Sequence, residues 1–460
     1  MGSLKSLFAP TDMTVGPPWK KIIAFAIPML IGNIAQQLYN TVDSIVVGRY
    51  VGDNALAAVG SAGPILNLLL VLFVGISVGA SIMVSQYFGA KEREELSSTI
   101  GCCITLTAIS SVIIMVLAPM LIRPLLHLLN TPESIIEWCD SYLTILFVGI
   151  AGMAFYNILS GILRGLGDSV SALIYLLVST VLNIILDVWF VAGLSMEVAG
   201  VALATAIAQG VSAVLCLLRL SRMKEIFDLK PRYLKPGKRH SLMIVKLGLP
   251  SGLTQAIFSM AMIVVQSLTN SFGEMVIAAN VIIMRVDGFA MMPNFSFGTA
   301  MTTYAGQNVG ANNYKRVDDG AKQGTLIAVA VSTVITALIL IFGKYLMGVF
   351  TETAELVQLS NHMMHILAAG YIAMAVTQCL SGMMRGAGDT MTPMWISLIT
   401  TVALRVPVAY GIAWLTRSEL YPNGRSECIF ISLLVSWVIG ALITAVSYRR
   451  GKWKSKSIQA

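Results

Sequence analysis

The sequence predicts an all-α membrane protein with twelve transmembrane helices arranged as two parallel six-helix lobes. Three observations support this fold class: an apolar composition, a series of long uncharged segments, and an internal repeat. Of the 460 residues, 56% are hydrophobic and only 12% are charged, whereas soluble domains average about 25% charged residues. The composition excludes a soluble globular protein and a disordered chain, and it predicts that most of the chain is solvated by lipid.

A spanning helix needs about 20 mostly apolar residues, and the gaps between charged residues supply twelve such stretches. They comprise residues 22–42, 54–90, 96–122, 141–163, 169–186, 198–218, 247–273, 288–314, 323–343, 356–384, 390–404 and 428–448. The apolar runs are continuous and do not alternate with a period of two, which favours helices over barrel strands.

The distribution of positive charge predicts the orientation in the membrane. If the N-terminus is cytoplasmic, 24 of the 31 Lys and Arg residues fall on the cytoplasmic side and five fall outside. Because cytoplasmic loops are enriched in Lys and Arg, we expect both termini in the cytoplasm. We also expect a multi-pass protein of a prokaryotic plasma (inner) membrane. The net charge of +8 is thereby explained by topology, and no nucleic-acid partner is expected.

The two halves of the chain resemble each other when one is shifted by 221 residues. Residues 159–168 (LSGILRGLGD) then align with residues 380–389 (LSGMMRGAGD), and seven of the ten positions are identical. Each copy has six spans, an even number, so both copies start on the same side and are related by an axis along the membrane normal. We therefore predict an N-terminal lobe (1–218), a basic cytoplasmic linker (219–242) and a C-terminal lobe (243–460) around a site for alternating access.

The repeated RGxGD element has a structural interpretation in both copies. Its glycines permit a turn with positive φ, and Asp168 and Asp389 can cap the helix that follows. Arg164 and Arg385 can bond the exposed carbonyl groups at the end of the preceding helix. A direct contact with substrate is the alternative role for this motif.

Acidic residues inside the apolar stretches are the main functional candidates, because an acid at membrane depth costs several kcal/mol on insertion scales. Asn183 and Asp187 are four residues apart, so they share one helix face. Carboxylate, amide and hydroxyl oxygens suit Na⁺, while two carboxylates brought together in a low dielectric hold a proton near neutral pH. Both ions therefore remain candidates, and the alternative is that Asp43 or Asp187 only caps a helix near the outer face.

Together these features resemble the multidrug and toxic compound extrusion (MATE) family. The resemblance rests on the twelve spans, the duplicated lobe, the repeated RGxGD and the QxxGA pattern at 86–90 and 307–311. It implies an antiporter, not an enzyme, that expels amphipathic, often cationic small molecules in exchange for H⁺ or Na⁺ by rocking two lobes around a cavity. It also implies a monomer surrounded by membrane lipids, with no cofactor other than the transported ion.

The resemblance is to the DinF-like branch of that family, which carries a cation site in the N-terminal lobe. The cation-coupling residues it implies are Asp43, Asn183, Asp187 and Thr205, with Asn157 and Tyr142 as a supporting polar shell. Gln36 on the first helix is a looser match. The NorM-like branch has an acid in the seventh span, where this chain has Gln255 and no acid between Lys246 and Glu274.

A second group of candidates is expected to line a substrate cavity or a second acid site. It consists of Asp287, Gln36, Gln255, Met260 and Met292. Asp287 alternatively forms an internal ion pair with Arg285 or Arg405, which relieves the cost of burial. The methionines suit a promiscuous apolar pocket, although they also suit the core or the lipid-facing surface.

Pro28 lies in the middle of the first span, where it removes a backbone hydrogen bond and permits a bend. In DinF-like members the first helix is proposed to bend when the acid site is protonated, so Pro28 is a candidate hinge; a passive kink is the alternative. The rival function within the same superfamily is a lipid or lipid-linked oligosaccharide flippase. The cysteine and histidine spacings predict no metal site.

Overall fold

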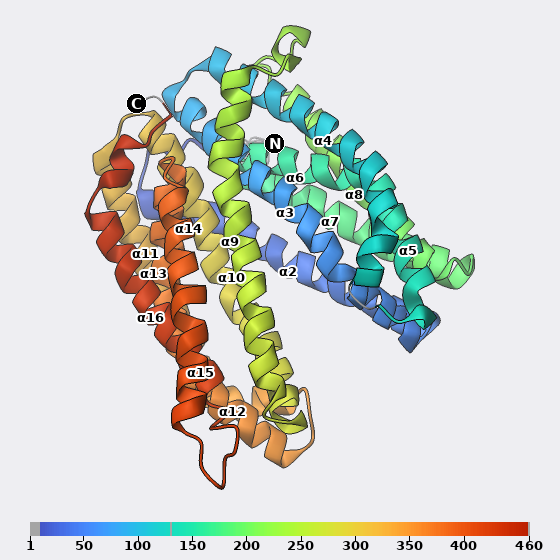
Figure 1. Ribbon diagram of the computed structural model, residues 1–460. Coiled ribbons are helices and arrows are strands. Elements are labelled where there is room, and N and C mark those ends of the chain that lie inside the picture. The colour runs from blue at the N-terminus through green and yellow to red at the C-terminus, as the bar shows by residue number, and fades with distance from the viewer. Residues whose placement is uncertain (1–9, 129–130, 459–460) are drawn as a thin grey trace. The chain divides into compact units, whose positions relative to one another are not determined.

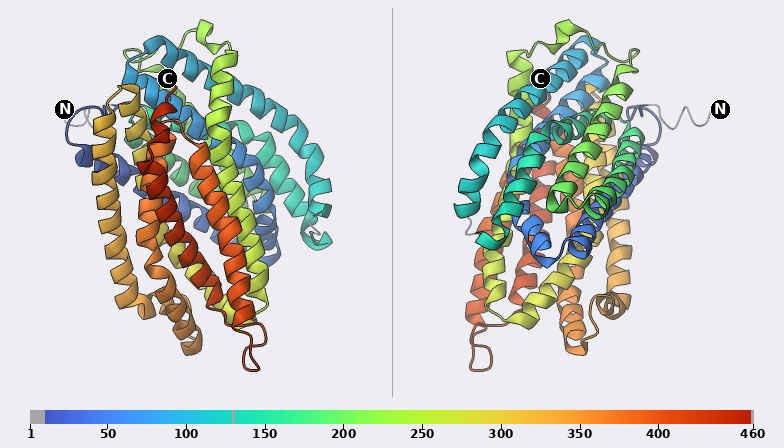
Figure 2. Two further views of the ribbon diagram at one scale, coloured as in Figure 1. Left: turned by 60° about the vertical axis from the view of Figure 1, so that its left-hand side comes forward. Right: turned by 90° about the vertical axis from the view of Figure 1, so that its right-hand side faces the viewer.

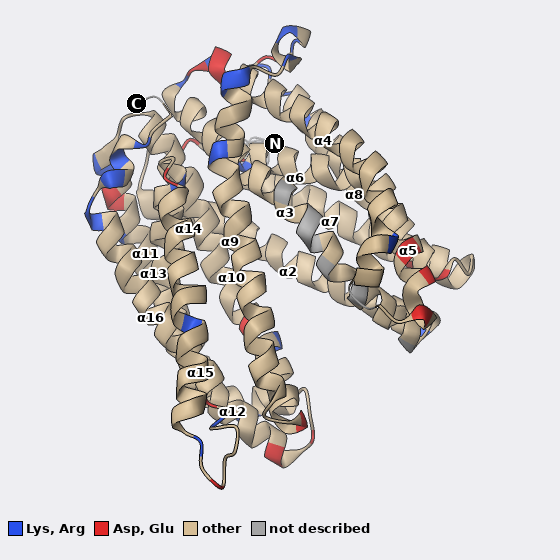
Figure 3. Ribbon diagram, in the orientation of Figure 1, with Lys and Arg blue, Asp and Glu red and all other residues tan. Residues whose placement is uncertain are grey.

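The computed structural model describes residues 10–128 and 131–458, and the regular elements in these ranges are all helical (Figure 1). Ten helices are long and apolar enough to cross a membrane, or twelve when two bent helix pairs each count as one span. The predicted all-α membrane fold with twelve spans is thus confirmed within the described residues. Figure 3 shows that charged residues gather toward the helix ends and are sparse along the spans.

The helices of the first half of the chain are α2 (Pro18–Tyr50), α3 (Asp53–Ala90), α4 (Arg93–Leu128), α5 (Glu133–Val148), α6 (Ile150–Gly165), α7 (Ser169–Asp187), the π-helix η1 (Val188–Gly193) and α8 (Glu197–Ser221). A short 3₁₀ helix, η2 (Pro231–Leu234), lies between α8 and α9. Because α9 begins at Lys238, helices enter the predicted linker 219–242 from both of its ends.

The helices of the second half are α9 (Lys238–Asn270), α10 (Glu274–Gly310), α11 (Tyr314–Gly348), α12 (Ala354–Ala368), α13 (Gly370–Gly386), α14 (Met391–Leu398), the π-helix η3 (Ile399–Leu404), α15 (Arg405–Leu415), α16 (Cys428–Arg449) and the 3₁₀ helix η4 (Lys452–Ser455). The chain divides into two compact units. The first contains Ile31–Gly252 and the described residues before Met13, and the second contains Met13–Leu30 and the residues from Leu253 onward.

The chain passes between the two units three times, and two of these crossings lie inside helices, in α2 and in α9. Each of these two follows a proline. In α2 the boundary falls after Leu30, two residues beyond Pro28. In α9 it falls after Gly252, two residues beyond Pro250. A proline inside a helix removes one backbone hydrogen bond and weakens the helix locally. The first helix of each repeat therefore has a proline that weakens it at an equivalent position.

In the first unit, α3 and the first part of α9 approach each other through glycines. A Cβ atom on Gly79 would lie 2.4 Å from the carbonyl oxygen of Ile244, and one on Gly248 would lie 2.4 Å from the carbonyl oxygen of Gly75. Gly75 and Gly79 are four residues apart, as are Gly248 and Gly252. This spacing of small residues lets the backbones of two membrane helices pack at close range.

The two bent helix pairs occupy equivalent positions in the two repeats. The axis turns by 53° between α5 and α6 and by 44° between α12 and α13. A Cβ atom on Gly149, at the first bend, would lie 2.6 Å from the Cβ atom of Ala206 in α8. One on Gly370, at the second bend, would lie 2.5 Å from the ring of Trp437 in α16. At each bend a glycine therefore permits close packing against the last long helix of its own repeat.

In the second unit α13 is the central helix, and it packs against α10, α11 and α16 (Figure 2). The segment before α2 is anchored in this unit through the second QxxGA pattern. The backbone N–H of Met13 donates to Oε1 of Gln307 at 2.8 Å, and Nδ2 of Asn308 donates to the Met13 carbonyl at 3.2 Å. The side chain of Met13 is fully buried.

Both RGxGD elements form turns in which glycine has positive φ, +83° at Gly167 and +99° at Gly388. Asp168 is the N-cap of α7 and accepts from the backbone N–H of Ser171 at 3.0 Å. Asp389 accepts from the backbone N–H of Thr392 at 3.1 Å, at the start of α14. The two motifs thus perform the same local task of ending one helix and starting the next.

The two copies of the motif differ in their ionic contacts. The side chain of Asp168 is 1% exposed and forms an ion pair at 3.0 Å with Arg219, in the last turn of α8. Arg164 donates to the hydroxyl group of Ser160 at 3.2 Å. Within the described residues, no Lys, Arg or His side chain lies within 4.0 Å of Asp389. Arg385 is in the last turn of α13.

Candidate cation-coupling site

The candidate site lies in the first unit, where α2, α7 and α8 bring polar side chains together in an apolar surrounding. Asp43 is on the part of α2 that belongs to this unit, and Thr205 is on α8. Asn183 and Asp187 are one turn apart at the end of α7, as their spacing predicts. Directly after Asp187 the helix widens into the π-helix η1, an irregularity that often occurs at functional sites.

The side chain of Asn183 joins the two acids. With its amide nitrogen turned toward the carboxylates, that atom lies 2.8 Å from Oδ1 of Asp43 and 3.1 Å from Oδ2 of Asp187. Asn183 and Asp187 are both 0% exposed. In the opposite orientation the amide oxygen would face two carboxylates and no donor, so the electrostatics require the nitrogen here.

The orientation of this amide is set by a chain of hydroxyl groups on the other side. The second amide atom of Asn183 lies 3.4 Å from Oγ1 of Thr205, and that hydroxyl accepts from the phenol of Tyr39 at 3.0 Å. Because Tyr39 donates to Thr205, the hydroxyl hydrogen of Thr205 is available to the amide oxygen of Asn183. No pattern in the sequence singles out Tyr39, although it lies four residues before Asp43 on the same helix face.

The two carboxyl groups lie close enough to each other for one to donate a proton to the other in a hydrogen bond. Asp187 also has a buried oxygen, Oδ1, for which the described residues supply no hydrogen-bond donor. Buried polar atoms are normally satisfied, so this oxygen can accept a bond from a bound cation. Among the described residues, no group of three or more His, Cys, Asp or Glu side chains is arranged to hold a metal ion.

The predicted supporting residues have different positions. Tyr142 of α5 is buried and within electrostatic reach of Asp43 and Asp187. The side-chain amide of Asn157, on α6, donates to the Met153 carbonyl of its own helix at 2.9 Å. Gln36 is half-buried, seven residues before Asp43 on α2. The cluster joined by hydrogen bonds thus contains Tyr39, Asp43, Asn183, Asp187 and Thr205.

The candidates of the second group lie in the second unit, on α9 and α10, apart from Gln36. Asp287 of α10 accepts from the phenol of Tyr371 at 2.9 Å. Gln255 and Met260 are exposed on α9, while Met292 is buried on α10. Pro28 also belongs to the second unit and is half-buried on α2.

The described residues form no direct ion pair at Asp287, although the buried Arg405 is within electrostatic reach of its carboxylate. Within the described ranges, no Lys or Arg nitrogen lies within 4.0 Å of its carboxylate. Arg285 is exposed, and Arg405 is 3% exposed with its Nη1 at 3.5 Å from Sδ of Met262. The sequence could not show which group satisfies the Asp287 carboxylate. An arginine was the expected partner, whereas in the structure the phenol of Tyr371 on α13 donates to it.

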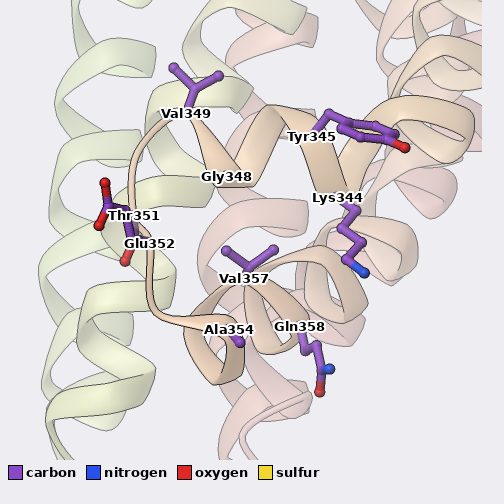
Figure 4. A pocket seen from close by; sticks show the side chains of 9 residues that line it. All are labelled: Lys344, Tyr345, Gly348, Val349, Thr351, Glu352, Ala354, Val357 and Gln358. Atoms are coloured by element: carbon purple, nitrogen blue, oxygen red, sulfur yellow. The ribbon is translucent and has the colours of Figure 1, made fainter.

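A pocket of about 520 Å³ is located in the second unit, between the end of α11 and the start of α12. Figure 4 shows its lining, with Lys344 and Tyr345 from α11, Thr351 and Glu352 from the connecting segment, and Gln358 from α12. Its nine lining residues include none of the predicted site residues, so it is separate from the acid cluster.

A multi-pass helical membrane fold with a buried pair of acids in its spans defines the class of the protein as a membrane transporter, because such acids mark ion pathways. The family follows from comparison with known proteins. The MatE family profile matches residues 28–189 and 250–411, one stretch in each repeat. The chain belongs to the MatE family, and its recognition from the sequence is confirmed.

Two relatives and one solved structure illustrate the extent of the similarity. The chain is 30% identical to the probable multidrug resistance protein YpnP of Bacillus subtilis over 97% of this chain and 98% of that protein. It is 24% identical to the DNA damage-inducible protein F of Escherichia coli over 95% and 93% of the two chains. The outward-facing structure of a multidrug resistance MATE family transporter superposes with a TM-score of 0.89 at 25% identity, covering 97% of this chain and 99% of that chain.

Proposed function

We propose that the protein is a cation-coupled antiporter that exports amphipathic, often cationic compounds across the plasma membrane by alternating access. Membership of the MatE family and the names of its relatives support export of drugs or toxins. The excess of Lys and Arg on one side of the spans supports a topology with both termini in the cytoplasm. The flippase alternative has less support, because YpnP is named a probable multidrug resistance protein and because the spans contain few cationic residues.

The observation that carries this proposal is the pair of acids joined by the amide nitrogen of Asn183. Two buried carboxylates that are both ionised repel each other, and in a low dielectric this repulsion is large. A bound cation removes the repulsion, and its release restores it. Occupancy of the site therefore changes the electrostatic energy of the surrounding helices, which is the requirement for coupling an ion gradient to a conformational change.

The geometry favours H⁺ over Na⁺ as the coupling ion. A Na⁺ site needs several oxygen ligands, and Asn183 would supply its oxygen only if its amide turned away from the orientation in which its nitrogen donates to both carboxylates. The amide oxygen faces Thr205, whose hydroxyl group is already engaged by Tyr39. A proton requires only the two carboxyl groups, which are within hydrogen-bond range of each other.

Pro28 is the proposed mechanical element of the cycle. It lies on the same helix as Asp43, 15 residues earlier, which is about 22 Å along a straight helix. The unit boundary in α2 lies between these two residues. A change of charge at Asp43 alters the contacts of the later part of α2 with α7 and α8, and the helix can respond by bending at Pro28 because a hydrogen bond is already missing there.

Transport of a fluorescent cationic dye into the lumen of everted membrane vesicles, which corresponds to export from the cell, tests this proposal. The wild-type protein is expected to move the dye when a pH gradient is imposed and not when only a Na⁺ gradient is imposed. Asp43→Asn and Asp187→Asn are expected to lose this gradient-driven transport, and Asp287→Asn shows whether the candidate acid of the second unit is needed as well. Transport by Asp43→Asn at the wild-type rate under the pH gradient would reject the site, and transport driven by Na⁺ alone would reject H⁺ coupling.

A further inference from the structure

A groove of about 780 Å³ lies in the second unit, near the ends of α11 and α16 that carry positive charge (Figure 3). Residues of α11 line one part of it and residues of α16 another, while Leu380 of α13 contributes between them. Its volume is within the range of about 300–1,000 Å³ that is usual for small-molecule sites. The acid cluster of the first unit contributes no residue to the lining.

The polar end of the groove is cationic. Lys322, Arg449 and Lys454 line it together with a single acid, Asp318. Nζ of Lys454 lies 2.9 Å from one carboxylate oxygen of Asp318, and the phenol of Tyr448 donates to the other at 2.9 Å. Within residues 10–128 and 131–458, neither Lys322 nor Arg449 has an acid within 4.0 Å. Two positive charges are thus uncompensated at this end.

The chain reverses direction after α16, and this reversal places Lys454 at the groove. Gly451 has φ +70° and opens the turn, after which η4 runs back. Trp453 is 1% exposed, stacks on Tyr448 at 5.0 Å between ring centroids and donates to the Tyr448 carbonyl at 2.9 Å. The hydroxyl group of Tyr314, at the start of α11, donates to the Lys454 carbonyl at 3.2 Å. The cationic end is therefore held by specific contacts.

The other end of the groove is apolar and extends along the spans. On α11 the lining changes along the helix from Asp318 and Lys322 to Leu326 and Val329. Leu326 is 70% exposed, so this end is open to the surroundings of the spans. Tyr and Trp residues are enriched where membrane helices leave the hydrocarbon core, and the aromatic cluster around Trp453 indicates that level. The groove thus presents cations at the membrane boundary and an apolar surface on the hydrocarbon side.

We propose that this groove binds an acidic phospholipid, with the phosphate between Lys322, Arg449 and Lys454 and an acyl chain along Leu326 and Val329. Basic pockets between membrane helices are known sites for anionic head groups. The positive charge of the groove repels a cationic drug, so the groove does not suit the proposed transport substrate. The lipid belongs to the cytoplasmic leaflet under the topology proposed above, but the site itself does not depend on the transport mechanism.

The experiment measures the thermal stability of the purified protein in detergent micelles with increasing mole fractions of dioleoyl phosphatidylglycerol. Dioleoyl phosphatidylcholine has the same acyl chains without net charge, and glycerol 3-phosphate and inorganic phosphate supply the anion without a lipid. The wild-type melting temperature is expected to rise in a saturable way with phosphatidylglycerol only. An equal rise with phosphatidylcholine, or with either soluble anion alone, would overturn the proposal of an acidic-lipid site.

The paired variants separate a specific site from general attraction between charges. Each Lys or Arg near an anionic surface changes binding about fivefold, so Lys322→Gln with Arg449→Gln is expected to raise the half-saturating mole fraction about 25-fold. The control pair, Arg450→Gln with Lys452→Gln, removes two exposed cations from the same segment that do not line the groove. An equal loss in both pairs would contradict the site. If the first pair does not melt cooperatively, the two single variants, each expected to lose about fivefold, decide the question.

Discussion

The duplicated RGxGD element provides an internally controlled prediction about stability. Asp168→Ala removes the N-cap of α7 and leaves Arg219 without the acid that it contacts at 3.0 Å. Asp389→Ala removes the equivalent backbone contact, at 3.1 Å, from a carboxylate that has no such ion pair in the described chain. The two substitutions therefore share the loss of a cap and differ in the loss of an ion pair.

The magnitudes follow from these contacts. Loss of an N-cap costs about 0.5–2 kcal/mol, which is the full effect expected for Asp389→Ala. Removing one partner of a buried ion pair costs about 3–5 kcal/mol. The side chain of Asp168 is 1% exposed and that of Arg219 is 22% exposed. Because Arg219 is partly exposed, the lower end of that range applies to the loss of this ion pair. We expect Asp168→Ala to cost about 3–5 kcal/mol in total. At about 2–4 °C per kcal/mol, its melting temperature should fall several degrees more than that of Asp389→Ala.

Thiol labelling during heating measures both variants, because all six cysteines are buried in the native protein. They are distributed over both units, at Cys102, Cys103, Cys139, Cys216, Cys379 and Cys428. Arg219→Gln combined with Asp168→Ala should cost much less than the sum of the two single changes, because both single changes disrupt the same ion pair. Equal shifts for Asp168→Ala and Asp389→Ala would refute the assignment of the ion pair as the difference between the motifs.

Substitutions at Thr205, at Pro28 and Pro250, and at Gly79 test other parts of the mechanism and of the packing. Thr205→Val leaves the buried hydroxyl group of Tyr39 without its acceptor. The substitution should therefore lower the free energy of unfolding by about 1–3 kcal/mol and reduce gradient-driven dye efflux. Thr205→Ser keeps the acceptor and should retain both stability and efflux. Pro28→Ala and Pro250→Ala each remove a residue that disfavours a straight helix by about 3 kcal/mol, which is about 100-fold in an equilibrium constant. If the helix bends during the cycle, each substitution should slow transport. Unchanged transport rates would show that the prolines are only passive kinks. Gly79→Ala should destabilise the protein by about 1–3 kcal/mol through overpacking, because the added Cβ atom would lie 2.4 Å from a backbone carbonyl oxygen. The control is Gly60→Ala on the same helix, where the added Cβ atom meets nothing within 4 Å. In a thermal melt this control should be neutral or stabilising.

Much of the fold could be predicted from the sequence, because the cost of burying charge in lipid restricts where Lys, Arg, Asp and Glu occur. The gaps between these residues mark the spans, and the repeat follows from direct alignment. The bends at Gly149 and Gly370 were missed, since a glycine inside an apolar run does not reveal that another helix packs against it. The π-helices after Asp187 and before Arg405 have no local signature, because they depend on packing between helices.

The candidate site was partly predictable for a similar reason. Asp43 and Asp187 stand out because acids in spans are rare, and the spacing of Asn183 and Asp187 defines a shared helix face. Tyr39 was missed because a tyrosine in a membrane helix is not unusual on its own. Its role depends on α2 lying beside α8, where its hydroxyl group reaches Thr205, and a pattern along one helix contains no information about that pairing.

Reversed transport is the most direct test of whether the pair of acids, Asp43 and Asp187, exchanges H⁺ for the exported compound. In proteoliposomes without an initial pH gradient, an imposed gradient of a cationic dye should drive H⁺ in the opposite direction, which a pH-sensitive dye in the lumen records. We expect dye-driven H⁺ movement in the wild type and its loss in Asp43→Asn and Asp187→Asn. Dye movement without opposing H⁺ movement in the wild type, or undiminished H⁺ movement in both acid-pair variants, would contradict the claim.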